Sequence, residues 1–447
     1  MSVPLSPVRR RDILDALRRG TVPHRGLDVL AVGLDRFESA LDAELDAVGQ
    51  GGAHFKAVRG EYGSGKTFFA RWFTEQAKKK GFATAEIQIS EGETPLHKLE
   101  TVYRRVIENL ETSEASPSAF REIVDGWFHV LETDAVAAGA PENNEEALTV
   151  ATTGLMEKRL LAVTKTAPAF SAALRSYREA QMAGDIAQAD GLLSWLGGQP
   201  HVAASVRRTA GIRGELDHFG ALGFLQGLLA VLRDSDYRGL VLVLDEVETL
   251  QRVRADVRER SLNALRQLLD EIDGGRFPGL YVVITGTPAF YDGTQGIQRL
   301  PPLAQRISAD FSGDPRFDNP RAPQLRLLPL TTLSLNELGR RVRGIYASGS
   351  AVESRILSLI DDAYLDELAA TISGHLGGRV GIAPRLYLRT LVDIIDRVEQ
   401  FDDYRPPAAN SAQVSATDLT EEERAATYLG KPAPAASIDD IDLSVTD

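Results

Sequence analysis

The chain has 447 residues, of which 43% are hydrophobic and 25% charged, and its formal net charge is −13. This length and composition are typical of a globular protein with two or three domains, and the acidic balance opposes a protein coated in nucleic acid while leaving room for a local basic patch. The sequence contains no cysteine, which excludes disulfides, thiolate metal sites and a cysteine nucleophile.

The N-terminal segment, residues 1–50, is expected to hold two helices that lead into the first domain. Residues 8–20 place Ile13, Leu14 and Leu17 on one helical face, and a second helix is expected at 34–47. No apolar signal core follows the N-terminus, and no apolar run in the chain approaches the roughly 20 residues of a membrane span. We therefore expect a cytoplasmic protein without membrane contact.

A phosphate-binding loop is predicted at residues 60–67, which fit the pattern G-x-x-x-x-G-K-[ST]. In such a loop the glycines let backbone N–H groups approach the phosphates of a nucleotide, the lysine reaches the β- and γ-phosphates, and the final hydroxyl is a Mg²⁺ ligand. A glycine-rich turn that caps a helix would suit the same residues, but a strand expected at 53–58 and an amphipathic helix expected at 67–80 favour the phosphate loop. The nucleotide-binding candidates are Gly60, Glu61, Tyr62, Gly63, Ser64, Gly65, Lys66, Thr67 and Phe68; Lys66 is also a catalytic candidate and Thr67 a metal ligand.

After a further strand expected at 82–89, residues 96–234 carry almost only helical patterns. A stretch of this length is too long to be a simple connection between two strands. We interpret it as a helical insertion within a nucleotide-binding core that consists of residues 51–95 and 235–332.

An acidic strand follows the insertion. Residues 240–244 are all apolar, and Asp245 and Glu246 come directly after them, which predicts a strand buried on both faces with a polar carboxyl end. Ligands bind at that edge of nucleotide-binding sheets. We expect Asp245 to hold Mg²⁺ and Glu246 to orient and deprotonate the attacking water; the alternative is an acidic turn that caps a buried strand.

Another buried strand is expected at 279–288, and its polar end should lie beside Asp245 and Glu246 in a parallel sheet. Thr285 and Thr287 are both candidates to sense the γ-phosphate or hold the water, and we place Thr287 among the catalytic residues. A hydroxyl that satisfies a turn explains either threonine equally well.

The last part of the chain is expected to close the sheet and then to become helical. A final strand is predicted at 324–330, and helices are predicted at 334–347, 353–375 and 384–400, within a C-terminal helical domain of residues 333–400. Residues 401–447 contain ten acidic and three basic residues, a net charge of −7, and are expected to form an acidic, flexible tail.

These parts, in this order, resemble an AAA+ ATPase, a P-loop NTPase whose parallel sheet is flanked by helices and followed by a helical lid. Residues 381–385, G-x-x-P-R, resemble the second sensor of the initiator and origin-recognition clade. The resemblance implies that Arg385 contacts the γ-phosphate, that Arg306 is an arginine finger reaching a neighbouring subunit, and that Val32 and Gly33 lie beside the adenine. It therefore also implies an ATP-dependent homo-oligomer.

A closer resemblance is to the ATP-binding proteins of BREX-type bacteriophage-exclusion systems, of the BrxD kind. It covers about residues 10–400 and rests on four stretches, which are 13–23, 59–69, 193–198 and 239–248. It implies an ATPase of a bacterial antiviral system that uses ATP and Mg²⁺ to control assembly with, or remodelling of, a DNA-acting partner such as a helicase. It does not identify the partner.

A second class of function stays open, a nucleotide-gated scaffold or sensor that turns ATP over rarely and recruits DNA or partner proteins. A two-lobed helicase does not fit, because the chain is mainly helical after residue 330. Arginines cluster at 252–260 and 340–343, where DNA contact of modest affinity would be expected. The alternative is a solvated helix face that pairs with acids, which is favoured because no aromatic residues are interleaved with these arginines.

Overall fold

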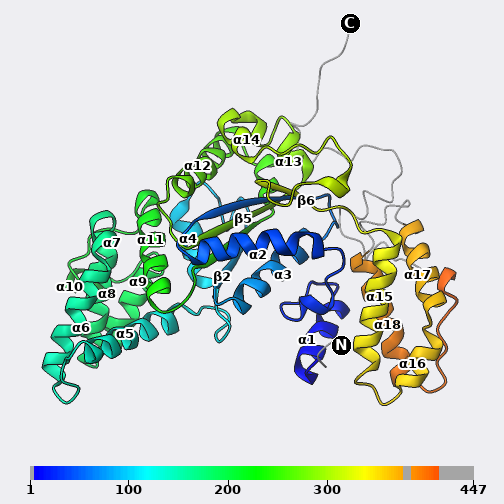
Figure 1. Cartoon of the computed structure of the whole chain (residues 1–447), viewed down its shortest axis with the longest axis horizontal. Coiled ribbons are helices and arrows are strands. Elements are labelled where there is room, and N and C mark those ends of the chain that lie inside the picture. The colour runs from blue at the N-terminus through cyan, green and yellow to red at the C-terminus, as the bar shows by residue number, and fades with distance from the viewer. Residues whose placement is uncertain (1–4, 376–383, 412–447) are drawn as a thin grey trace, which may run out of the picture. The chain divides into compact units, whose positions relative to one another are not determined.

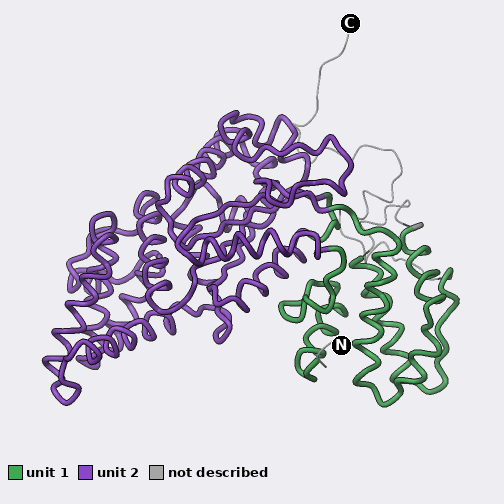
Figure 2. Tube along the Cα trace, viewed as in Figure 1, with its two compact units in different colours: residues 1–33, 61–65, 328–447 green, residues 34–60, 66–327 purple. Residues whose placement is uncertain are grey.

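The structure is a computed structural model of the chain, and it describes residues 5–375 and 384–411. The chain forms two compact units (Figure 2). Unit 1 comprises residues 1–33, 61–65 and 328–447, and unit 2 comprises residues 34–60 and 66–327. Of the predicted second-sensor motif, residues 381–383 lie outside the described residues, as do residues 412–447 of the acidic tail.

Unit 2 is built on a six-stranded sheet with the strand order β3-β2-β4-β5-β1-β6. All neighbouring strands are parallel except β2 and β3, which are antiparallel. The strands are β1 (His54–Arg59), β2 (Ala83–Gln88), β3 (Leu110–Glu111), β4 (Leu240–Asp245), β5 (Leu280–Gly286) and β6 (Gln324–Arg326). The chain therefore has the mixed α/β architecture and the largely parallel sheet that the sequence predicted.

The two central strands, β4 and β5, are buried along their whole length. Their runs of leucine, valine and isoleucine suit this position, because a parallel strand covered on both faces has no solvent-facing side chains. Their register pairs Leu244 with Ile284, while β5 pairs Gly286 with Arg59 of β1. The carboxyl ends of β1, β5 and β4 therefore lie side by side at one edge of the sheet.

Helices cover both faces of this sheet (Figure 1). α2 and α3 pack against one face, where Phe37 and Phe69 meet edge to face, and α4, α11 and α12 cover the other. The helices of unit 2 are α2 (Asp35–Gly49), α3 (Lys66–Lys79), α4 (Leu99–Glu108), α5 (Phe120–Ala137), α6 (Glu145–Arg159), α7 (Leu161–Thr166), α8 (Pro168–Met182), α9 (Ile186–Leu196), α10 (Ala204–Thr209), α11 (His218–Asp234), α12 (Ala255–Asp273), α13 (Pro288–Asp292) and α14 (Pro301–Ile307).

The residues predicted to form a helical insertion, 96–234, belong to unit 2 and share its hydrophobic core. α4 shows how they join it, because its buried side chains recur at helical spacing and face the sheet and α11. One element was missed. β3 adds a two-residue antiparallel strand at the edge of the sheet, and a segment this short has no alternation from which a strand could be predicted.

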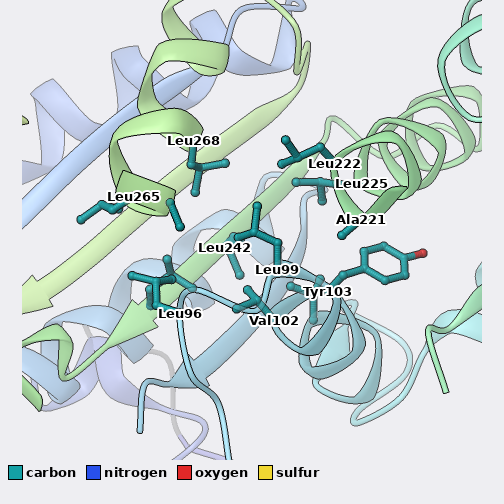
Figure 3. Close-up of a pocket in the computed structure, with 13 residues that line it drawn as sticks. Leu96, Leu99, Val102, Tyr103, Ala221, Leu222, Leu225, Leu242, Leu265 and Leu268 are labelled. Atoms are coloured by element: carbon teal, nitrogen blue, oxygen red, sulfur yellow. The ribbon is translucent and has the colours of Figure 1, made fainter. Parts of the chain in front are cut away.

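A small cavity lies between β4 and the helices α4, α11 and α12 (Figure 3). Its volume is about 30 Å³, and its lining is almost wholly apolar, including Leu99, Leu225 and Leu242. An apolar cavity that is large enough for little more than one water molecule is a packing defect of the core. It is not a nucleotide site, because it offers no partner for phosphate.

Unit 1 brings the N-terminal helix together with the C-terminal helices. Its helices are α1 (Pro7–Arg18), α15 (Thr332–Ala347), α16 (Glu353–Leu359), α17 (Asp362–His375) and α18 (Pro384–Gln400). α1 packs on α15 and α18, and Arg18 donates two hydrogen bonds of 2.7 and 2.8 Å to the carboxylate of Asp396. Residues 1–33 belong to unit 1 and α2 belongs to unit 2, whereas residues 1–50 were expected to form one N-terminal segment.

Two further details of unit 1 differ from the prediction. The helix expected at 353–375 is broken into α16 and α17, because the Asp361 carboxylate accepts a hydrogen bond from Tyr364 N at 2.8 Å and caps a new helix. Residues 401–447 were expected to be flexible, but η6 (Ala409–Ser411) packs on α17 and the Tyr364 hydroxyl donates to Pro407 O at 3.2 Å. Across the described residues of both units, no helix is long and apolar enough to cross a membrane.

A buried ion pair links α2 to the sheet in unit 2. Lys56 in β1 is 1% exposed, and its ammonium donates to Glu44 Oε1 at 2.6 Å and to Ala322 O at 2.8 Å. The other carboxylate oxygen of Glu44 accepts from the Tyr281 hydroxyl at 2.5 Å. Burial of this pair is tolerated because both charged groups have hydrogen-bond partners.

We expect Lys56→Met to lower the free energy of unfolding by about 3 kcal/mol, because it leaves the Glu44 carboxylate buried without its cation. Urea denaturation measures the change. Lys78→Met is the matched control, since Lys78 pairs with Glu111 at 2.7 Å nearer the surface, and it should cost less than about 1 kcal/mol. Equal losses in the two variants would show that the buried pair has no special role.

Candidate functional site

The predicted phosphate loop joins the end of β1 to the start of α3. Gly63 and Gly65 have φ angles of 78° and 89°, a region that side chains with a Cβ rarely adopt. Ser64 N donates to Glu61 O at 3.1 Å and closes a tight turn. Loops that alternate such conformations turn successive N–H groups toward one concavity, which is an anion-binding arrangement.

Lys66 begins α3, and its ammonium is buried beside the end of the sheet. The Nζ atom donates to Gly60 O at 3.0 Å and lies 3.6 Å from Glu248 Oε1. Phe69 and Phe73 on the same helix are buried against the core and fix its position. The residue expected to reach phosphates therefore lies within contact distance of a carboxylate.

Asp245, the last residue of β4, is buried and accepts hydrogen bonds from three directions. Thr67 Oγ1 donates to its Oδ2 atom at 3.1 Å, and the Thr285 hydroxyl donates to its Oδ1 atom. Glu246 N donates to the same Oδ1 atom at 3.1 Å. The parallel register brings these groups together from α3, β4 and β5, so the carboxyl ends of β4 and β5 meet as the sequence predicted.

Glu246 follows Asp245 in a left-handed backbone conformation, with φ 59° and ψ 43°. This conformation is uncommon for a residue with a side chain and is found at functional sites. Gln88, at the end of β2, donates from Nε2 to Glu246 Oε2 at 2.7 Å. Gln88 was not among the predicted site residues, although its position at the end of the neighbouring strand β2 was a signal.

Glu248 is a second acidic residue that the sequence analysis left without a role. It lies in the 3-10 helix η2 (Val247–Gln251), is 6% exposed, and its Oε2 atom has no hydrogen-bond partner within the described parts of the chain. Burial raises the pKa of this carboxyl group, and the nearby Lys66 ammonium opposes that rise. Only its position in the first turn after the acidic strand could have indicated a functional role for Glu248 from the sequence.

The arginines at 252–260 do not form a single basic surface. Arg258 turns inward and donates to the carbonyl oxygens of Leu250 at 3.1 Å and of Gln251 and Val253 at 2.9 Å, which anchors the segment that carries Glu248. Beside it, Arg254 and Arg260 lie 3.5 and 3.2 Å from the carboxylate of one aspartate, Asp256.

The second arginine cluster, at 340–343, is also paired with acids. Arg340 and Arg343 lie within 3.2 Å of Asp362, and Arg341 lies 2.8 Å from Glu337. The pairing with acids that was favoured from the sequence is therefore present at Arg254 and Arg260 of the first cluster and at all three arginines of the second.

Thr287 and Arg306, two further predicted site residues, belong to unit 2. Thr287 is buried at the start of α13 and makes no side-chain capping bond to it. Arg306 on α14 forms an ion pair with Asp270 of α12 and lies 4.0 Å from Asp273. Val32, Gly33 and Arg385 belong to unit 1, and their roles stay predictions.

The residues around Asp245 suit a magnesium ion. Thr67 Oγ1 and Asp245 Oδ2 are neighbouring oxygen atoms, and Mg²⁺ prefers oxygen ligands, of which one or two carboxylates are supplied by protein and others by phosphate. Glu246 follows Asp245 in the chain, and its carboxylate accepts a hydrogen bond from Gln88. The arrangement can hold a cation, a nucleotide phosphate and a carboxylate base at one edge of the sheet.

The family model described as "BREX system ATP-binding protein BrxC/D" matches residues 5–413, which cover parts of both units. A search of curated proteins found no match.

Two buried threonines at the end of β5 are distinguished by a pair of variants. Thr285→Val removes a hydrogen bond to the Asp245 carboxylate and should lower the free energy of unfolding by about 2 kcal/mol. Thr287→Val loses no such bond and should change it by less than about 0.5 kcal/mol. Chemical denaturation compares the two, and a larger loss in Thr287→Val would contradict the assignment of Thr285 as the partner of Asp245.

Proposed function

The chain belongs to the BREX system ATP-binding protein family BrxC/D, and from this premise we propose that it is a Mg²⁺-dependent AAA+ ATPase. Its ATP state would control assembly with, or remodelling of, a DNA-acting partner such as a helicase. The observation that carries the proposal is the convergence of Lys66, Thr67, Asp245 and Glu246 at one edge of a parallel sheet.

Binding of ATP would rest on the loop and on Lys66. Backbone N–H groups of residues 60–67 would cradle the phosphates, and the buried Lys66 ammonium would face the β- and γ-phosphates. Thr67 and Asp245 would hold Mg²⁺, which when bound offsets the negative charge of the phosphates. The 3.1 Å contact between their oxygen atoms supports this assignment.

Hydrolysis would use Glu246 as the base. A water molecule attacks the γ-phosphorus, the bond from that phosphorus to the β–γ bridging oxygen breaks, and a proton of the water passes to the Glu246 carboxylate. The products are ADP and inorganic phosphate. Thr285, which donates to Asp245, is the better supported of the two threonines as the residue that positions groups around the γ-phosphate, and Thr287 stays the alternative.

We further propose that the ATP-bound form is a homo-oligomer in which Arg306 reaches a neighbouring subunit's site. Arg306 would then exchange its ion pair with Asp270 for contact with phosphate. Arg385 would contact the γ-phosphate of its own subunit, and Val32 and Gly33 would lie beside the adenine. These roles rest on the AAA+ resemblance.

A protein partner is favoured over extensive DNA contact. Arg254 and Arg260 of the first cluster pair with an aspartate of the same chain, and the arginines of the second cluster also pair with acids. The net charge of −13 opposes non-specific DNA binding. Direct contact with DNA would therefore be of modest affinity and would weaken with salt. Membership of a phage-defence family supports another defence-system protein as the partner.

A second function, a nucleotide switch with little turnover, is favoured by one contact. Glu246 Oε2 accepts a hydrogen bond from Gln88 at 2.7 Å, so one oxygen of the proposed base is already engaged. If this contact restrains the base, Gln88→Ala should hydrolyse ATP faster than the wild type. The protein would then switch between a state in which Gln88 holds Glu246 and a state in which Glu246 is released, and it would not hydrolyse ATP continuously.

Two variants distinguish the binding of ATP from its hydrolysis. Wild-type protein should gain about 3 kcal/mol of stability in ATP and Mg²⁺ at a hundredfold excess over the dissociation constant. Glu246→Gln should keep this gain while turnover falls about a hundredfold, because the shape is kept and the base is lost. Lys66→Ala should lose the gain. Thermal unfolding and phosphate release measure the two properties.

Two results would contradict these assignments. An equal stability gain in Lys66→Ala would show that the loop does not bind the nucleotide. Turnover at the wild-type rate in Glu246→Gln would show that another group positions the water.

A further inference from the structure

Glu248 lies where a carboxylate would affect any anion that Lys66 binds. Its Oε1 atom is 3.6 Å from Lys66 Nζ, and both side chains are buried, with 6% and 9% of their surfaces exposed. Its Oε2 atom has no hydrogen-bond partner among the described residues. A buried carboxylate with an unsatisfied oxygen is costly, so its position calls for a reason beyond packing.

The surroundings of Glu248 hold it in this position. It lies in the short helix η2, whose neighbouring residue Val247 is fully buried. Arg258 binds the carbonyl oxygen of Leu250 at 3.1 Å and that of Gln251 at 2.9 Å at the end of the same helix. The carboxylate is therefore presented to Lys66 by an anchored segment.

We propose that Glu248 is an internal competitor of phosphate, a carboxylate that shares the Lys66 ammonium with the nucleotide and thereby sets its affinity. The proposal rests on the proposed function, because it assumes that Lys66 binds the terminal phosphates of ATP. In this role Glu248 binds neither the metal nor the attacking water. It determines the affinity for the nucleotide and not the rate of the chemical step.

The physical basis is the single charge of the ammonium. Lys66 has three N–H donors, one of which is given to Gly60 O at 3.0 Å. A phosphate beside Lys66 would lie close to the Glu248 carboxylate as well, and like charges in a buried site repel each other strongly. Glu248 thus stabilises the buried ammonium when no phosphate competes, and it opposes the phosphate when one binds.

Removing only the charge of Glu248 should have two opposite effects. In Glu248→Gln the Lys66 ammonium loses its anionic neighbour, so the protein without nucleotide should unfold at a lower temperature. The same change removes the repulsion of phosphate, so ATP should bind about tenfold more tightly, a change of about 1.4 kcal/mol. A residue with a purely structural role would lower the stability without raising the affinity.

The test is calorimetric titration of the full chain with ATP and Mg²⁺, together with thermal unfolding in the absence of nucleotide. Glu44→Gln is the matched control, because Glu44 forms the other buried lysine pair of unit 2, at 2.6 Å from Lys56. The control should lower the unfolding temperature and leave the dissociation constant for ATP unchanged. Glu248→Asp withdraws the carboxylate by one methylene and should tighten binding about threefold, which provides a milder variant if Glu248→Gln does not fold.

The outcomes separate the inference from the proposed function. Failure of the wild type to bind ATP would overturn the proposed function itself. If the wild type binds ATP and folded Glu248→Gln or Glu248→Asp binds it equally or more weakly, the competitor role is wrong. Tighter binding in Glu44→Gln would equally overturn it, since the gain would then not be specific to Lys66.

Discussion

The hydrogen bonds that Asp245 accepts from Thr67 and Thr285 tie three elements of unit 2 to one point. They exist because β1, β5 and β4 run parallel in this order, so that the start of α3 and the ends of both buried strands meet at one edge. A one-residue shift in the register of β5 would carry Thr285 to the other face of the sheet. The proposed metal ligands and the proposed base depend on this alignment.

Charged groups at this edge already have partners within the protein. Lys66 lies between a backbone carbonyl and Glu248, and Glu246 accepts a hydrogen bond from Gln88. Lys66 and Glu246 both have roles in the proposed reaction. Binding of ATP would therefore require them to exchange these contacts for contacts with the nucleotide and the attacking water. Acidic and amide side chains beside such a site can therefore alter its nucleotide affinity and turnover without any change in the loop itself.

Local sequence patterns were sufficient to predict the loop, the strands β1, β2, β4 and β5, and the helices α3 and α12, because glycine spacing and apolar runs act over a few residues. The roles of Gln88, Glu248 and Arg258 were not predictable in this way. Each depends on a contact that folding creates, Gln88 with Glu246, 158 residues away in the chain, and Arg258 with the carbonyl oxygens of a turn. Arg258 shows this most clearly, since it was grouped with a charged helix face and its hydrogen bonds hold it, half-buried, against the backbone of that turn.

The central claim is that the loop and Asp245 form one site for ATP and Mg²⁺. Calorimetric titration with ATP, with and without Mg²⁺, tests it most directly in the wild type and in Asp245→Asn. We expect Mg²⁺ to tighten ATP binding to the wild type at least about tenfold and Asp245→Asn to lose most of this gain. An equal effect of Mg²⁺ on both proteins would contradict the claim, because Asp245 would then not hold the metal.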